Sequence, residues 1–201
     1  MLDLKKAFKM SMYTIMMNNF HRTVKNLFTK HLFVTNVVTC SSLLGVGDVL
    51  CQKLEHRYQK GTKNEIHKIN WVRTGRMCTV GLAVGPVGHF WYKILDRYIV
   101  CKGTKTVTAC KKILADQILA APFFLAIFFV GMNVLEGKGV KGGVKEVKEK
   151  FVKVYMMDWA VWAPTQFINF YFLPPQVRMV YVSCITLIWD CVLSYLKHTV
   201  I

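Results

Sequence analysis

The chain has 201 residues, of which 53% are hydrophobic and 19% charged, with 27 Lys and Arg against 11 Asp and Glu. That length suits one domain, and the composition, with a mean hydropathy of +0.31, favours a compact membrane bundle. The charges lie in four blocks separated by apolar stretches, whereas a soluble enzyme spreads its charge over its surface. The pattern therefore argues against a soluble enzyme. The blocks are residues 1–30, 53–70, 96–112 and 136–153.

Residues 1–30 form a basic N-terminal region, with six Lys and Arg and a single acid, Asp3. Apolar side chains recur at helical spacing from Tyr13 to Phe28, and polar and basic side chains occupy the opposite face. Such a helix is typical of a mitochondrial address or of a helix lying in the membrane interface. We favour mitochondrial targeting without cleavage, because the apolar stripe continues into the first predicted span. Residues 31–201 are expected to form one transmembrane helical domain.

Five apolar stretches approach the roughly 20 residues that a helix needs to cross a bilayer. The fourth and fifth are separated only by Pro174 and Pro175, and two prolines break a helix. A tight hairpin there gives five spans, and a single kinked segment gives four. The sequence thus predicts an all-α membrane protein, a bundle of four or five transmembrane helices. The stretches are His31–Leu50, Met77–Leu95, Ile113–Leu135, Val154–Leu173 and Val177–Leu196.

Three further segments carry glycine or charge patterns with a structural meaning. Gly81 and Gly85 form a small-xxx-small motif, which we interpret as a close contact between helices. Residues 137–143 are rich in Gly and Lys but lack the spacing of a phosphate-binding loop, so we predict a flexible, solvated loop. Residues 144–153 alternate Lys with Glu, which predicts a polar helix outside the membrane.

Polar side chains interrupt the apolar stretches at helical spacing. Polar groups in a bilayer prefer the interior of a bundle, so we expect these stripes to face one another and the apolar faces to contact lipid. Static pairing that fixes helix register is the favoured interpretation, and a polar path through the bundle is the alternative. The candidate intramembrane polar or pore-lining residues are Asp48, Gln52, Arg73, Arg76, Asp116, Gln166, Asn169 and Asp190.

The acids among these candidates need partners, because an ionised residue inside a span costs about 2.5–3.5 kcal/mol on insertion scales. Arg73 and Arg76, at the start of the second stretch, are the expected partners of Asp48. Lys112 lies one turn from Asp116 and is its expected partner.

Catalytic and metal-binding signatures are missing from the sequence. The six histidines show no helical pair and no companion Cys or carboxylate at ligand spacing, so no metal site is predicted. The seven cysteines form no CxxC motif and are interpreted as small buried hydrophobes. Since no nucleophile–base arrangement, Walker loop or dinucleotide fingerprint appears either, we expect no enzyme and no cofactor.

Motifs in chain order resemble those of one family of organellar membrane proteins. Residues 47–52 fit a GDxxxQ signature, and residues 85–96 fit GPxxHxWYxxLD. Residues 112–122 fit a KxxxDQ…P element, and residues 159–194 follow a pattern of W…W…Q..NF…P…R…W…LS. The order and spacing hold from about residue 31 to the C-terminus. The chain thus resembles the family of Mpv17 and the peroxisomal membrane protein of twenty-two kilodaltons.

One departure from the family pattern lies in the fourth stretch. The family usually has proline directly after the second tryptophan, where this chain has Ala163, and the proline follows as Pro164. The bend of that helix is therefore expected one residue later.

The resemblance implies an integral protein of an organellar membrane, here the mitochondrial inner membrane, with the peroxisomal membrane as the alternative. Similar proteins of the branch that this chain most resembles are linked to assembly and stability of the mitochondrial ribosome, and so to mitochondrial translation. Other members are discussed as small non-selective channels tied to redox and metabolite homeostasis. We expect the first role, exerted by contact, with the channel as the alternative.

Two partners are expected. Juxtamembrane Lys and Arg attract anionic lipid, and the resemblance adds the large subunit of the mitochondrial ribosome. Membrane orientation is left open, because every predicted loop is basic. The oligomeric state is left open as well.

Overall fold

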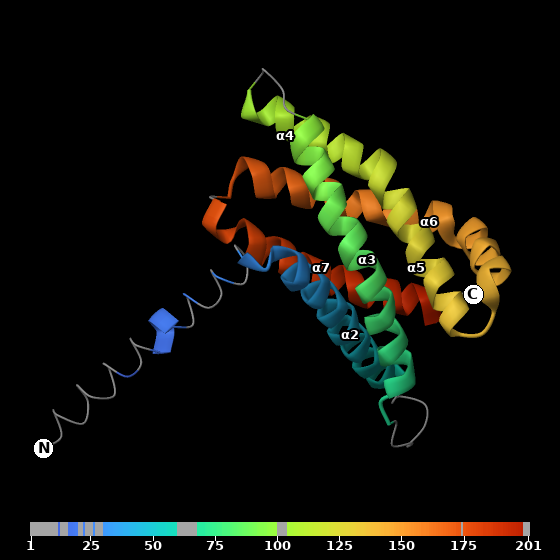
Figure 1. The fold of residues 1–201 in the computed structure, drawn as a ribbon. Coiled ribbons are helices and arrows are strands. Elements are labelled where there is room, and N and C mark those ends of the chain that lie inside the picture. The colour runs from blue at the N-terminus through green and yellow to red at the C-terminus, as the bar shows by residue number, and fades with distance from the viewer. Residues whose placement is uncertain are drawn as a thin grey trace, which may run out of the picture. The chain divides into compact units, whose positions relative to one another are not determined.

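A computed structural model gives the fold of the chain (Figure 1). The chain divides into two compact units, residues 1–36 and 37–201. The predicted amphipathic helix over 1–30 lies mostly outside the described residues and stays a prediction. The described residues are 12, 16–19, 22, 26, 30–59, 68–99, 104–173 and 175–198.

The described part of the chain is helical and contains no strand, which confirms the all-α class. A π-helix, η1, joins α4 to α5, so these three elements run on without a break from 105 to 135. The helices are α2 Leu32–Gln59, α3 Trp71–Tyr98, α4 Lys105–Ala115, η1 Asp116–Ala120, α5 Ala121–Leu135, α6 Gly139–Tyr171 and α7 Pro175–His198.

Two helical segments among the described residues are long and apolar enough to cross a bilayer, Leu32–Arg57 and Thr106–Leu135. They contain most of the first predicted span and all of the third. The second and fifth predicted spans lie in α3 and α7, and the fourth lies in α6 up to Tyr171. That these three segments cross the membrane stays a prediction.

The predicted break between the fourth and fifth stretches is confirmed. Helix α6 ends at Tyr171 and α7 begins at Pro175. Proline fits the first position of a helix, because the N–H group that it lacks would have no partner there. By contrast Pro164 lies inside α6, which continues past it.

The predicted flexible loop over 137–143 is wrong beyond its first two residues, because α6 begins at Gly139. Gly137 and Gly139 have φ angles of 80° and 68°, in the left-handed region that glycine adopts without strain. A Cβ atom on Gly143 would lie 2.6 Å from the Cα atom of Val130. Gly143 therefore allows close packing of α6 against α5, and the helix runs on directly into the predicted polar segment 144–153.

The core of the second unit lies between α3, α5, α6 and α7. Helix α5 packs along α6 (Figure 1, yellow and orange) and also contacts α3. The largest fully buried apolar side chains are Phe129, Met77, Met132 and Val154.

Glycines set the contact of α2 with α3, as the small-xxx-small motif predicts. A Cβ atom on Gly81 would lie 2.6 Å from the Cα atom of Ser41, and one on Gly85 would lie 2.7 Å from the Cα atom of Val37. Side chains at these two positions would collide with the backbone of α2. The predicted contact is therefore confirmed.

We expect Gly81→Ala to lower the free energy of unfolding by about 1–3 kcal/mol, since an added methyl group must push two backbones apart. Gly75→Ala, on the same helix, is the matched control, because a Cβ atom there meets nothing within 4 Å. It should stabilise the protein by about 0.5–1 kcal/mol through helix propensity. Unfolding of both variants in detergent micelles measures the difference, and equal effects would contradict the close contact.

Candidate functional site

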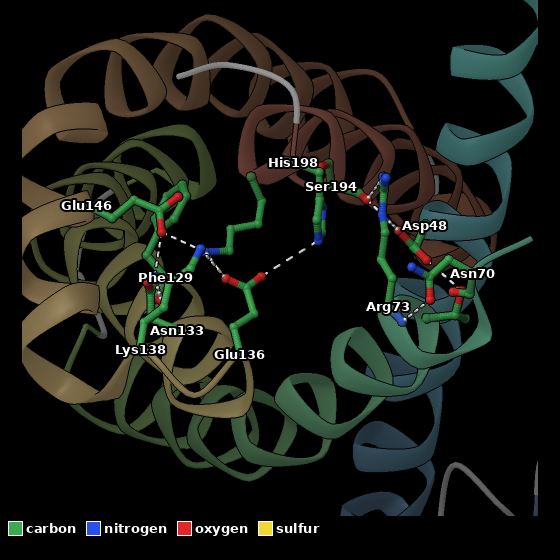
Figure 2. Close-up of polar contacts among 12 residues, drawn as sticks. Asp48, Asn70, Arg73, Phe129, Asn133, Glu136, Lys138, Glu146, Ser194 and His198 are labelled. Carbon is green, nitrogen blue, oxygen red and sulfur yellow. Dashed lines mark hydrogen bonds and ion pairs between the residues drawn. The ribbon is translucent and has the colours of Figure 1, made fainter.

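Asp48 on α2 is the centre of a buried polar cluster that joins α2, α3 and α7 (Figure 2). Its Oδ1 atom accepts hydrogen bonds from Arg73 Nε at 2.7 Å and Ser194 Oγ at 2.6 Å. Its Oδ2 atom accepts from Thr74 Oγ1 at 2.6 Å and Gln52 Nε2 at 2.7 Å. We call these five residues the Asp48 cluster, and the predicted pairing of Asp48 with Arg73 is confirmed.

Arg73 is shared between two carboxylates. Its Nη1 and Nη2 atoms lie 3.0 and 3.1 Å from the two carboxylate oxygens of Glu55, a bidentate arrangement. Arg76, the other predicted partner of Asp48, lies about one turn further along α3 and is half-buried.

Gln52 ties the end of α2 to the start of α3. Its Oε1 atom accepts a hydrogen bond from the backbone N–H of Asn70 at 2.7 Å. Asn70 in turn caps α3, because its side chain accepts from the backbone N–H of Arg73. A Cβ atom on Gly47 would lie 2.7 Å from Asp190 Cβ, so this glycine lets α7 approach α2. The GDxxxQ residues therefore hold three helices together.

A second polar cluster surrounds Lys197 near the end of α7. The Lys197 side chain is 2% exposed, and its Nζ atom lies 2.6 Å from Glu146 Oε2 and 3.2 Å from Glu136 Oε2. Lys150 Nζ lies 2.9 Å from Glu146 Oε1, and the Asn133 amide also donates to Glu146. We call these five residues the Lys197 cluster. Figure 2 shows the two clusters on either side of the last turns of α7.

Ion pairing controls the charge of the two glutamates in the Lys197 cluster. Burial alone would raise the pKa of Glu146, but hydrogen bonds from Lys197, Asn133 and Lys150 lower it to about 2. Lys138 and Lys197 likewise hold the pKa of Glu136 below its ordinary value despite burial. Both acids are therefore ionised at neutral pH.

The residues of the Lys197 cluster are missing from the sequence-predicted candidates. A signal for Lys197 exists, because it continues the helical stripe of Asp190 and Ser194 on α7. For the glutamates no comparable signal exists, since Glu146 lies in the segment 144–153 that reads as an exposed alternation of Lys and Glu, and Glu136 directly precedes the predicted loop 137–143.

A cavity of about 200 Å³ lies inside the bundle, between α2, α3, η1, α5, α6 and α7. Three of the predicted candidates line it: Asp116, Gln166 and Asp190. Asn169 is buried and donates a hydrogen bond to Gln166 Oε1 at 3.3 Å. The predicted polar residues are thus divided between two places, because Asp48, Gln52 and Arg73 belong to the Asp48 cluster.

The cavity also contains polar residues absent from the predicted candidates. Asp158 of α6 and Gln117 of η1 line it and are buried. Asp116 accepts a hydrogen bond from Trp91 Nε1 at 2.8 Å, and its predicted pairing with Lys112 stays a prediction. In the part of the chain that the structure describes, no three His, Cys, Asp or Glu side chains are grouped so as to hold a metal ion.

Comparisons with known proteins identify one family model and several relatives that resemble this chain. Residues 133–194 match the model of the Mpv17 / PMP22 family. The chain is 36% identical over 175 residues to the mitochondrial inner membrane protein Mpv17 of Danio rerio, covering 87% of this chain and 94% of that protein.

Two further relatives extend the range of locations and organisms. The chain is 34% identical over 172 residues to PXMP2/4 family protein 2 of Dictyostelium discoideum, covering 85% of this chain and 87% of that protein. It is 32% identical over 164 residues to peroxisomal membrane protein 2 of Bos taurus, covering 81% of this chain and 82% of that protein. No solved structure matches the chain.

Proposed function

Because the chain belongs to the Mpv17 / PMP22 family, we propose that it supports assembly and stability of the mitochondrial ribosome, and hence mitochondrial translation. It is a protein of the mitochondrial inner membrane, the location named for several relatives. A peroxisomal relative gives the peroxisomal membrane as the alternative. The proposed role is exerted by contact with the ribosome at the membrane surface.

Five membrane-crossing segments are part of this proposal: α2, α3, the joined α4–η1–α5, α6 and α7. At about 1.5 Å per residue, even the 24 residues of α7 reach about 36 Å, longer than a bilayer core of about 30 Å. The bundle buries several acids and amides, among them Asp48, Asp158 and Gln117, and each segment exposes large apolar side chains, as expected in lipid. Examples are Val46, Leu82, Phe123, Phe167 and Ile188.

The distribution of charge at one end of the bundle carries the proposed ribosome contact. Glu55 pairs with Arg73, and Glu136 and Glu146 pair with Lys197, so the charge of these acids is largely balanced by side chains inside the bundle. The lysines of the first turns of α6 remain exposed instead: Lys141, Lys145 and Lys148. A positive surface of this kind suits the phosphates of ribosomal RNA and the headgroups of anionic lipid.

The length of α6 supports a position of these lysines outside the hydrocarbon. Its 33 residues reach about 50 Å at 1.5 Å per residue, about 20 Å more than a bilayer core. Because the apolar part of α6 is its C-terminal half, the surplus falls on the lysine-rich first turns. These turns can therefore contact a large partner beside the membrane.

We expect the protein, after mild solubilisation, to co-sediment with the large subunit of the mitochondrial ribosome and to be released by raised salt, because phosphate contacts release counterions. A triple variant with Lys141, Lys145 and Lys148 changed to Gln should lose most of this co-sedimentation. The matched control changes Lys93, Arg97 and Lys111, which are exposed elsewhere on the bundle, to Gln.

Two results would count against the ribosome role. The first is wild-type protein that stays at the top of the gradient at low salt. The second is an equal loss of co-sedimentation in the control triple variant, which would contradict the assignment of the contact to α6.

The cavity favours a second candidate function, a small non-selective channel that affects organellar redox and metabolite homeostasis. Polar side chains from η1, α6 and α7 face it inside the bundle, and polar residues in this position mark solute pathways in membrane proteins.

Purified protein in planar bilayers should then conduct, and Asp190→Asn should reduce cation conductance at least about twofold, because acidic groups in a pore attract cations. Glu149→Gln is the control, since Glu149 is exposed on α6 outside the predicted span. Silent bilayers containing folded protein would argue against the channel.

A further inference from the structure

Three acidic side chains from three helical segments face the same cavity. They are Asp116 of η1, Asp158 of α6 and Asp190 of α7. Among the described residues, no Lys, Arg or His lines this cavity. Side chains therefore leave the negative charge here unbalanced, in contrast to Asp48, which has Arg73 beside it. Balance requires bound protons or a cation from outside the protein.

Gln117 supplies an independent observation that a ligand binds here. Its side chain lines the cavity and is 1% exposed, and its Oε1 atom has no hydrogen-bond partner among the described residues. A buried acceptor without a donor is costly, so the arrangement calls for a donor inside the cavity. Gln117 lies in the π-helix η1, and short π-helices within α-helices are frequent at functional sites.

The remaining wall of the cavity combines aliphatic side chains with aromatic ones, including Phe128, Trp162 and Trp189. Aromatic faces attract cations and pack against aliphatic chains. We propose that the cavity binds a small organic cation, with ammonium groups at the carboxylates and at Gln117 Oε1 and an aliphatic stem against the rings. The volume of about 200 Å³ equals about six or seven waters at about 30 Å³ each, which suits a short aliphatic amine or diamine.

An inorganic metal ion fits this site less well. The described residues contain no group of three His, Cys, Asp or Glu side chains placed to hold a metal ion, although three carboxyl groups line the cavity. Carboxyl groups at separate positions around a cavity suit a ligand with two separated positive charges, such as a diamine.

This site deepens the second candidate function and rests on it for its physiological meaning, yet binding and conductance are separate measurements. Binding without conductance would contradict the channel function and support the binding site. Conductance without binding would contradict the binding site and support the channel function.

The test uses the full chain in uncharged detergent, with putrescine as the probe and its neutral analogue butanediol as the control ligand. Putrescine should raise the unfolding temperature in a saturable way, because it binds only the folded state. Asp158→Asn and Asp190→Asn should each weaken its apparent affinity at least about tenfold, and the control Glu149→Gln should not. Tryptophan fluorescence, which Trp162 and Trp189 report from the cavity wall, gives the same affinity in the folded protein.

Several results would overturn the proposal. They are the absence of a putrescine effect, an equal effect of butanediol, and putrescine affinity that is unchanged in both Asp variants. Saturable stabilisation by magnesium chloride that putrescine cannot displace would assign the cavity to an inorganic cation and also overturn it.

Discussion

Replacing Asp48 with alanine should lower the free energy of unfolding by about 3–5 kcal/mol, the usual cost of breaking a buried ion pair from one side. The carboxylate is fully buried and accepts four hydrogen bonds from α2, α3 and α7. Its loss removes one of the two carboxylates that pair with Arg73, so that Glu55 remains, and it removes the acceptor of Ser194. Unfolding in detergent micelles by denaturant measures the change.

Glu149→Gln is the control for this experiment. Glu149 and Lys145 form an exposed pair with 3.9 Å between Oε1 and Nζ, and such pairs contribute little to stability. A loss in Asp48→Ala no larger than that in the control would contradict the structural role of the cluster.

Asp48→Asn then separates static pairing from a polar path through the bundle. The amide keeps the size of the side chain but removes its charge, so stability should fall. Because Asp48 is not among the residues that line the cavity, conductance per folded protein should stay unchanged. A clear change in conductance would place Asp48 on the conducting path instead.

Replacing Lys197 with methionine should lower the free energy of unfolding by about 3 kcal/mol or more at neutral pH. The ammonium group lies between Glu136 and Glu146 with almost no contact with solvent. Without it, two carboxylates repel each other in a partly buried site. Lys138 still pairs with Glu136 and Lys150 with Glu146, and His198 Nε2 lies 3.9 Å from Glu136 Oε1. Lys145→Met, at an exposed position on α6, is the control.

The glutamates of the Lys197 cluster should change stability with pH in opposite directions in the wild type and in Lys197→Met. In the wild type, Glu146 has its pKa lowered from 4.5 to about 2. Its stabilising effect is therefore complete above about pH 4.5 and disappears as the pH falls toward about 2. In Lys197→Met, protonation of a glutamate relieves repulsion, so the deficit relative to wild type should shrink as the pH falls below about 5. A deficit that is independent of pH would contradict this assignment.

The two clusters and the cavity lie in different parts of the bundle and differ in how their charges are paired. The two clusters join the helices at the end where α7 terminates, and Lys150 donates a further hydrogen bond to the Leu196 carbonyl at 2.8 Å. The end where α7 terminates thus has paired charges, whereas the acids of the cavity have no basic side chain among the described residues that line it.

The sequence alone specified the features that depend on local chemistry. The pair Pro174-Pro175 predicted a break between two helices, because proline lacks the donor that a helix interior needs, and α7 begins at Pro175. Gly81 and Gly85 marked a close helix contact, since only a missing side chain lets backbones meet. Arg73 and Arg76 were both identifiable as partners of Asp48, because a buried acid in an apolar stretch requires a cation, and the observed ion pair is with Arg73.

Only the tertiary structure decided which polar residues meet. Ser194 binds Asp48 across 146 positions of sequence, and helical periodicity gives the face of a residue but not the helix opposite. Helical periodicity likewise could not show that Lys197 pairs with Glu146, which lies in a segment that reads as exposed. Nor could it show that Asp158 and Gln117 line the same cavity as Asp116 and Asp190. Pairing between distant helices depends on how α2 to α7 pack together, and packing is a property of the whole fold.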